Sequence, residues 1–196
     1  MSDSNLRFYP YRAFLAVPLP EALREELGRL QKALRHSGVA WRYADPQHIH
    51  LTLLFLGDID RATEGAMTTT MDELASPDFS LPYPVEGLGA FPDLVEKPRV
   101  LWAGIGGNWA PLRHLHKTLA DAARGAGLEV EKQPYHPHLT LARIPKGFHG
   151  PLRLPEKLKG GFYGYLPIEK LVLFESRLSP AGPSYRAVHE RVLTGS

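Results

Sequence analysis

Residues 48–57, HIHLTLLFLG, and residues 136–145, HPHLTLARIP, share the tetrapeptide His-Leu-Thr-Leu. Successive side chains of a β-strand point to opposite faces. As a strand, each copy therefore presents its histidine and its threonine on one face, while its two leucines anchor the other face in a core. If the two strands face each other across a cleft, two imidazoles and two hydroxyls converge on one place.

The two motif histidines, His50 and His138, suit acid–base catalysis of a displacement at phosphorus. One neutral imidazole can accept the proton of an attacking hydroxyl or water, and the other, protonated, can donate to the departing oxygen. Histidine titrates near neutrality, so both forms can be present at working pH. The hydroxyls of Thr52 and Thr140 can donate to the non-bridging oxygens, where charge collects. The pattern predicts a site that needs no metal and no cofactor.

Two other interpretations of these histidines stay open. A single strand histidine is more often satisfied by backbone or water, although the repeated phase favours catalysis. His48 and His136 lie two residues before the motif histidines and would share their face in a regular strand, which would allow a four-histidine metal site. Because His-x-His alone is a weak signal, we favour a place at the mouth of the cleft or on the surface for both. Four further histidines are expected at the surface or in local hydrogen bonds: His114, His116, His149 and His189.

Composition sets the limits of this interpretation. In 196 residues, 43% apolar and 22% charged residues are typical of an ordinary globular protein. A net charge of +2 is too small for a broad basic surface, so an anion site must be local. The absence of cysteine excludes disulfides and thiolate sites. We expect no signal peptide, no membrane span and a cytoplasmic protein.

Hydrophobic periodicity predicts an α+β fold. Strands are expected at 12–19, the two motif copies, within 76–93, and at 99–105, 170–178 and 185–193, the last two joined by a turn at 179–184. A short strand or bend is expected at 39–46. Helices are expected at 20–38, at about 58–74 with Asp58 or Asp60 as N-cap, and at 111–124. A loop is expected at 145–161. Because each motif copy follows a helix and a short connection, we predict two similar lobes with antiparallel sheets, forming one domain over residues 1–196.

Two His-x-Thr motifs separated by nearly half the chain resemble the 2H phosphoesterase superfamily. Five segments in order resemble, more narrowly, the bacterial and archaeal RNA 2′,3′-cyclic phosphodiesterases, historically called 2′-5′ RNA ligases: YRAFLAVPLP, HIHLTLLFLGD, PRVLWAGI, YHPHLTLARIP and KLVLFESRLSPAGPSYR. The resemblance covers residues 11–192. It implies a bilobal α+β fold in which two pseudo-twofold-related lobes, antiparallel sheets flanked by helices, surround a central cleft.

The resemblance also implies an activity and a set of site residues. The expected reaction is hydrolysis of a terminal RNA 2′,3′-cyclic phosphate to a 2′-phosphate without metal, with His138 as proton acceptor and His50 as proton donor. The two copies are locally equivalent, so the residues alone leave these two roles interchangeable. The resemblance further places Phe55 and Arg143 in contact with substrate. Regular alternation puts both on the face opposite to the histidines, so a bulge or a strand end must turn them.

The expected partners are RNA ends that carry a 2′,3′-cyclic phosphate, tRNA halves among them, and we expect a monomer. Three alternative functions stay open: 2′-5′ RNA ligation in the same site, hydrolysis of a small cyclic nucleotide, and a non-enzymatic RNA-binding module. The presence of all four His-x-Thr residues argues against the binding module, because binding alone needs no acid–base pair. The modest net charge favours recognition of an end or a few nucleotides over a long duplex.

Overall fold

The computed structural model describes residues 8–36, 41–75, 79, 81–94, 97–144, 148, 154–180 and 182–193. Its strands are β1 (Tyr11–Pro18), β2 (Arg42–Tyr43), β3 (His50–Ile59), β4 (Tyr83–Phe91), β5 (Val100–Ile105), β6 (His138–Arg143), β7 (Phe162–Leu166), β8 (Lys170–Ser179) and β9 (Gly182–Val192). They form one sheet in the order β7-β4-β5-β6-β3-β1-β8-β9, with β2 paired to β6. All of these pairings are antiparallel.

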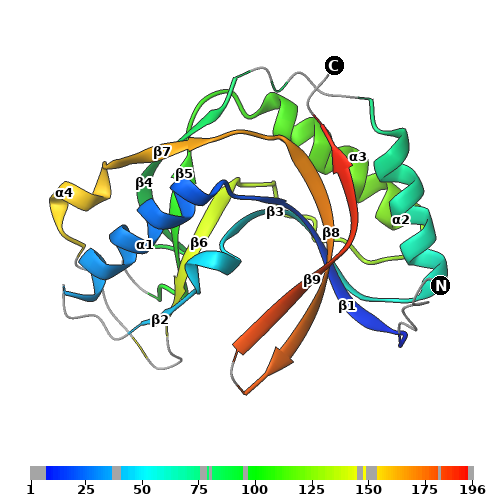
Figure 1. Cartoon of the computed structure of the whole chain (residues 1–196), viewed down its shortest axis with the longest axis horizontal. Helices are drawn as coiled ribbons and strands as arrows, with labels where there is room; N and C mark the ends of the chain where they lie inside the picture. Colours follow the sequence, from blue (N-terminus) through cyan, green and yellow to red (C-terminus); the bar gives the residue numbers. More distant parts are fainter. Residues whose placement is uncertain are drawn as a thin grey trace.

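The strand order has an internal symmetry that follows the repeated motif. The two motif strands, β3 and β6, are neighbours at the centre of the sheet, and three further strands extend from each of them to an edge. Leu51 of the first motif pairs with Leu139 of the second. The sheet curls into an open half-barrel, with the β8–β9 hairpin at one end (Figure 1). The predicted α+β fold with two antiparallel lobes is confirmed, and the two lobes share one continuous sheet: β3, β1, β8 and β9 form the first lobe, and β6, β5, β4 and β7 form the second.

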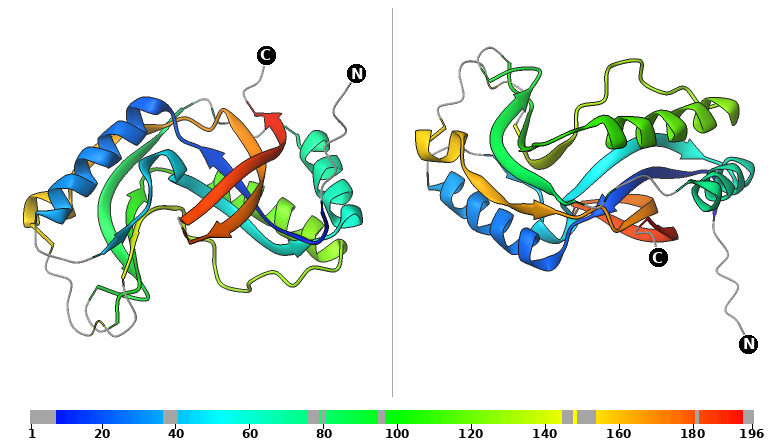
Figure 2. Two further views of the ribbon diagram at one scale, coloured as in Figure 1. Left: turned by 60° about the horizontal axis from the view of Figure 1, so that its bottom comes forward. Right: turned by 90° about the horizontal axis from the view of Figure 1, so that it is seen from above.

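The helices form where the sequence has amphipathic periodicity. They are α1 (Glu21–Arg35), the 3₁₀ turn η1 (Pro46–His48), α2 (Arg61–Glu73), α3 (Ala110–Gly125) and α4 (Glu156–Lys159). The expected N-cap of α2 is Asp60, whose carboxylate accepts a hydrogen bond from the Thr63 backbone N–H. Helix α1 lies at one end of the molecule, and α2 and α3 lie together at the other (Figures 1 and 2).

One hydrophobic core joins the helices to the sheet. The leucine stripe of α1 is buried, and so is the stripe of α3; its members are Leu23, Leu27, Leu30, Leu34, Leu112, Leu115 and Leu119. Leu51 and Leu139 are fully buried in the same cluster. The face of the sheet that carries the motif leucines is therefore the core face, and the motif histidines and threonines lie on the other face.

Three local features differ from the sequence-based expectation. The short strand expected before the first motif is present as β2, but it is followed by the 3₁₀ turn η1, which was not expected and begins at Pro46 with Asp45 as its N-cap. Strand β7 was not expected, because glycines interrupt the alternation in GFYGYLP. Helix α4 lies within the predicted loop at 145–161. The rest of that loop, including His149, lies mostly outside the described residues.

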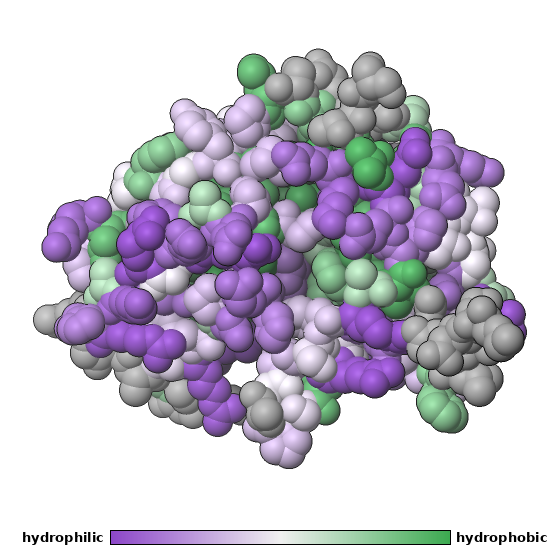
Figure 3. Space-filling view, in the orientation of Figure 1, coloured by the Kyte–Doolittle hydropathy of each residue, from purple (hydrophilic) through white to green (hydrophobic). Residues whose placement is uncertain are grey.

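No helix among the described residues is long and apolar enough to cross a membrane. The face seen in the orientation of Figure 1 is mostly hydrophilic, and hydrophobic residues show on it in small separate areas (Figure 3).

Candidate active site

The four polar residues of the two motifs lie side by side on one face of the central strands. Because the middle leucines of the motifs are paired, antiparallel register puts His50 next to Thr140 and Thr52 next to His138. All four side chains are partly exposed, whereas the leucines behind them are buried. We call these four residues the histidine face.

Each motif histidine is held by the backbone two residues before it. Nδ1 of His50 lies 2.7 Å from the carbonyl oxygen of His48, and Nδ1 of His138 lies 2.8 Å from that of His136. A carbonyl oxygen only accepts, so Nδ1–H is the donor in both bonds. This arrangement fixes the orientation of each ring and leaves its Nε2 to exchange a proton with a ligand. The two repeats thus hold their histidines in the same way.

Burial makes both rings less basic than an exposed histidine. Burial lowers the pKa of His50 to about 4, with the hydrogen bond to His48 opposing the shift and the nearby charge of His138 adding to it. Burial also lowers the pKa of His138, and the charge of Arg143 adds to that shift. The charge of His138 acts on His50, as expected for side chains on the same face of neighbouring strands.

A β-bulge turns Phe55 onto the histidine face. Strand β1 pairs with Leu54 and then directly with Thr52, so Leu53 is an extra residue in β3. This reverses the alternation beyond the motif. Phe55 is 58% exposed and its ring lies 6.1 Å from that of Phe14, which stacks on His50.

The second motif strand has the same bulge at the equivalent position. Strand β5 pairs with Ala142 and then with Thr140, which leaves Leu141 as the extra residue in β6. Arg143 is therefore exposed on the side of the histidines. Burial raises the pKa of Tyr185, and the charge of Arg143 partly opposes this shift. The sequence raised the need for a bulge, but nothing in its residue pattern indicated where the bulge would form.

Aromatic rings surround His50 within the first lobe. Phe14 stacks on the imidazole with centroids 4.7 Å apart, and Tyr185 of β9 meets it edge-on at 5.4 Å. Tyr185 also contacts the ring of His48, at 5.2 Å. These contacts restrict the rotation of the His50 ring around the axis that its Nδ1 hydrogen bond defines.

A different aromatic group surrounds His138 in the second lobe. Phe91 meets the His138 ring edge-on at 4.9 Å. The half-buried ring of His136 lies against Phe91, Trp102 and Trp109, with centroid distances of 5.6, 5.1 and 5.1 Å. These aromatic side chains, together with those of the first lobe, were missed by the sequence-based reasoning, because they come from segments that are far from the motifs in the sequence.

His48 and His136 do not share the strand geometry that a regular pattern would give them. His48 ends η1 and His136 precedes β6, so neither is a strand residue. Their carbonyl oxygens, rather than their rings, meet the motif histidines. In the part of the chain that the structure describes, no group of three or more His, Asp or Glu side chains is arranged to hold a metal ion.

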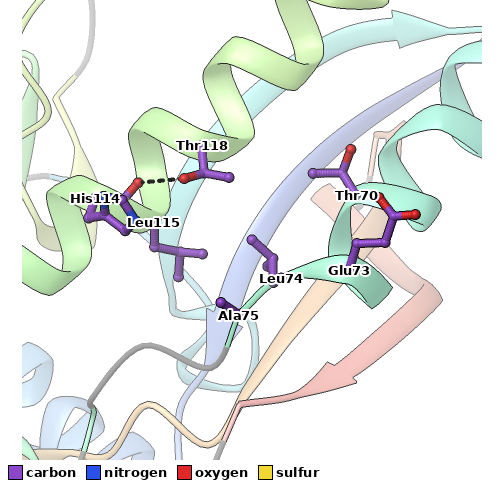
Figure 4. Close-up of a pocket in the computed structure, with 7 residues that line it drawn as sticks. All are labelled: Thr70, Glu73, Leu74, Ala75, His114, Leu115 and Thr118. Atoms are coloured by element: carbon purple, nitrogen blue, oxygen red, sulfur yellow. Dashed lines mark hydrogen bonds between the residues drawn. The ribbon is translucent and has the colours of Figure 1, made fainter.

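His189, His116 and His114 are not part of the histidine face. His189 Nε2 is 2.8 Å from a carboxylate oxygen of Asp72 in α2, and His116 of α3 stacks on Tyr135. His114 lines a pocket between α2 and α3, shown in Figure 4, where the Thr118 hydroxyl donates to the His114 carbonyl oxygen. None of the motif residues lines this pocket, whose members are Thr70, Glu73, Leu74, Ala75, His114, Leu115 and Thr118.

Comparison with known proteins gives one consistent result. The sequence model of the 2′-5′ RNA ligase superfamily matches residues 19–175. The RNA 2′,3′-cyclic phosphodiesterase of Aquifex aeolicus is 30% identical over 187 residues, which cover 94% of this chain and 98% of the relative. That of Aeropyrum pernix is 30% identical over 166 residues, covering 84% and 93%.

Solved structures share the fold. A crystal structure of a phosphoesterase superposes with a TM-score of 0.78 at 24% identity, covering 95% of this chain and 99% of that chain. Escherichia coli LigT complexed with 3′-AMP gives a TM-score of 0.75 at 23% identity, covering 96% and 100%. The curled antiparallel sheet of this chain is therefore the fold of those proteins.

Proposed function

Since this chain belongs to the 2′-5′ RNA ligase superfamily, we propose that it hydrolyses terminal 2′,3′-cyclic phosphates of RNA to 2′-phosphates. The reaction is carried by two histidines acting as base and acid, without a metal. The named relatives support the activity at the level of the family, and the histidine face supports the mechanism.

One observation carries this proposal: the matched hydrogen bonds of the two motif histidines. Both Nδ1 atoms are bound to a carbonyl oxygen of the preceding segment, so both Nε2 atoms are available at the same face. A merely structural histidine has no need for such a matched partner in the other repeat. Two proton-exchanging nitrogens on either side of one phosphate are what an in-line displacement requires.

The proposed reaction proceeds as a single displacement at phosphorus. Nε2 of His138 accepts a proton from water as the water oxygen bonds to phosphorus. The bond from phosphorus to O3′ breaks, and Nε2 of His50 donates its proton to O3′. The product carries a 2′-phosphate and a free 3′-hydroxyl, and a proton passes from His138 to His50 through solvent before the next turnover.

The remaining motif residues stabilise the phosphoryl group and hold the RNA. The hydroxyls of Thr52 and Thr140 donate to the non-bridging oxygens, where negative charge sits in the transition state. Arg143 binds phosphate through its guanidinium group, and Phe55 offers an exposed ring for stacking of a base.

Protonation of His50 is coupled to substrate binding in this scheme. With a pKa of about 4 in the free protein, His50 is neutral near pH 7. The negative charge of a bound phosphodiester favours the imidazolium form and raises the pKa. A proton is therefore taken up with the substrate, and His50 carries it as the donor to O3′.

The test is incubation of the full chain with an oligonucleotide that ends in a 2′,3′-cyclic phosphate, in EDTA and in ¹⁸O-labelled water. We expect one ¹⁸O atom in the product phosphate and the phosphate on O2′, identified by ³¹P NMR against synthetic standards. The control is a chain with both His50→Ala and His138→Ala. Activity that EDTA removes and added zinc or manganese restores would contradict the metal-free mechanism, and a 3′-phosphate product would contradict the direction of cleavage.

A further inference from the structure

Tyr135 links the segment before the second motif to strand β3, which carries the first motif. It lies three residues before His138, and its hydroxyl donates a 3.0 Å hydrogen bond to the carbonyl oxygen of Thr52 in β3. Its ring is stacked on His116 of α3, with centroids 4.6 Å apart and planes 8° from parallel. Both contacts join parts of the chain that are distant in sequence.

The hydroxyl bond lies beside the short ladder that joins the two motif strands. Within the described residues, the ladder between β3 and β6 has a single pair, Leu51 with Leu139. On the side toward the start of β3, the backbone N–H of Ala44 donates to the Leu141 carbonyl at 2.9 Å, as does Nε2 of Gln31. On the side toward the start of β6, the described link is the Tyr135 hydroxyl.

Tyr135 is also adjacent to the group that orients His138. The carbonyl of the next residue, His136, accepts the hydrogen bond from Nδ1 of His138. The carbonyl that Tyr135 binds belongs to Thr52, which antiparallel register places beside His138. One side chain therefore connects the backbone that orients one histidine with the strand that carries the other.

We propose that Tyr135 is a positioning residue that sets the spacing of the two motifs, so that His50 and His138 reach the same phosphate. Its hydroxyl fixes the lateral position of the segment before β6, and the stacking on His116 fixes its ring. Burial raises the pKa of Tyr135, so the hydroxyl stays a donor over the whole working pH range. The inference rests on the proposed two-histidine reaction, but its structural part can be measured separately.

The test is Tyr135→Phe, which keeps the ring and removes the donor. We expect kcat for the cyclic-phosphate oligonucleotide to fall about tenfold or more, because a displacement of about 1 Å between reacting groups can cost up to about a hundredfold. KM should change less than about threefold, since Phe55 and Arg143 are untouched. The matched control is Tyr163→Phe. Tyr163 is buried, and its hydroxyl also donates to a backbone carbonyl, that of Leu158, but Tyr163 lies in the edge strand β7. This control should keep its kcat.

A second measurement distinguishes positioning from general loosening. In ¹⁵N NMR spectra, the ring signals of His138 should change in Tyr135→Phe and stay as in the parent chain in Tyr163→Phe. His116→Ala removes the stacking partner of the Tyr135 ring but leaves the Tyr135 hydroxyl. It should also lower kcat, by a smaller factor than Tyr135→Phe. Unchanged kcat and unchanged His138 signals in a folded Tyr135→Phe protein would overturn the inference.

The outcome also separates this inference from the proposed function. If the parent chain does not hydrolyse the oligonucleotide, the proposed function fails, while inorganic phosphate added during the same NMR experiment still tests Tyr135. The inference then predicts a phosphate-dependent shift of the His138 signals that Tyr135→Phe weakens and Tyr163→Phe does not. Equal shifts in all three proteins would refute it.

Discussion

At the scale of single residues, the backbone carbonyls of His48 and His136 orient the two motif histidines. Each carbonyl fixes one imidazole, and an alanine at the same position supplies the same carbonyl. In the proposed reaction, the rings of His50 and His138 exchange protons, whereas His48 and His136 contribute their backbone carbonyls. Mutation can separate the two pairs.

We predict that His50→Ala and His138→Ala each lower kcat about a hundredfold or more, the usual scale for a positioned acid or base. His48→Ala and His136→Ala should lower it less than about tenfold, since the carbonyl acceptor stays. Turnover of the cyclic-phosphate oligonucleotide, with folding checked by circular dichroism, measures both. If the second pair proves as damaging as the first, the rings of His48 and His136 take part in the reaction, as in a four-histidine metal site.

The pH dependence follows from the same residues. Burial lowers the pKa of His50 to about 4 and also that of His138, so each ring loses its proton below the ordinary histidine pKa of about 6.5. Since kcat/KM reports the free protein, both limbs of its bell should lie below about pH 6.5 and its maximum should be acidic. The bound phosphodiester raises both pKa values, so kcat should peak at a higher pH.

Steady-state rates between pH 3 and 9 check this prediction, and the limbs report the coupled pair rather than either residue. Buffers of constant ionic strength are the necessary control, because phosphate contacts weaken with salt. Coincident optima for kcat and kcat/KM at or above neutrality would show that the burial of the two rings does not control their titration.

At the scale of elements, the paired bulges after the motifs explain how the fold presents groups that regular strands would hide. Leu53 and Leu141 each add one residue opposite a regular neighbour strand. Phe55 and Arg143, five residues after the motif histidines, are thereby turned to the histidine face. A bulge in the same place in both repeats indicates a designed feature of the strands rather than a local irregularity.

We predict that Phe55→Ala raises KM for the oligonucleotide about fivefold or more, with little effect on kcat, because stacking on one aromatic ring is worth about 1–3 kcal/mol per base. The 58% exposed side chain contributes little to stability, so the melting temperature should hardly change. Phe162→Ala is the matched control, because Phe162 is 55% exposed but lies in the edge strand β7. An equal KM in both variants would remove Phe55 from the binding surface.

The sequence predicted the motif strands because alternation and flanking leucines are local signals, and it predicted α1 and α3 because their leucines recur at helical spacing. It did not locate the bulges, since Leu53 and Leu141 are ordinary strand residues and the extra residue depends on the neighbouring strand. His48 was expected in strand phase, although Asp45 and Pro46 begin a 3₁₀ turn there. The Asp-Pro pair is a turn signal that can be found in the sequence. It is stronger evidence for local structure than the alternation of a single His-x-His.

At the scale of the whole molecule, the two lobes share one continuous sheet. The predicted single domain would follow from a sheet that runs without a break from β7 to β9 through the two motif strands. Tyr135 was missed for the same reason that the aromatic surroundings were missed: its partners, Thr52 and His116, become neighbours only when the second repeat folds against the first. A repeat can be found from sequence, but the contacts between its copies come from the assembled sheet.

Gln31 offers a test of whether the two lobes unfold together. The buried side chain lies in α1, and its Nε2 donates to the carbonyl oxygens of Ala44, at 2.8 Å, and Leu141, at 2.9 Å. It therefore joins a helix, the segment before the first motif and the strand of the second. Leu141 keeps the hydrogen bond from the Ala44 backbone N–H, so Gln31→Met leaves chiefly the Ala44 carbonyl without its side-chain donor.

We predict that Gln31→Met lowers the free energy of unfolding by about 2 kcal/mol, within the usual cost of one unsatisfied buried group, and the melting temperature by about 4–8 °C. Gln47→Met is the control, because the Gln47 side chain is exposed and its effect should stay within about 0.5 kcal/mol. Intrinsic fluorescence of the three tryptophans, Trp41, Trp102 and Trp109, and far-UV circular dichroism of the whole chain should report the same urea midpoint in each protein. Two separate transitions, with only the fluorescence midpoint moved by Gln31→Met, would show that the lobes unfold independently despite their shared sheet.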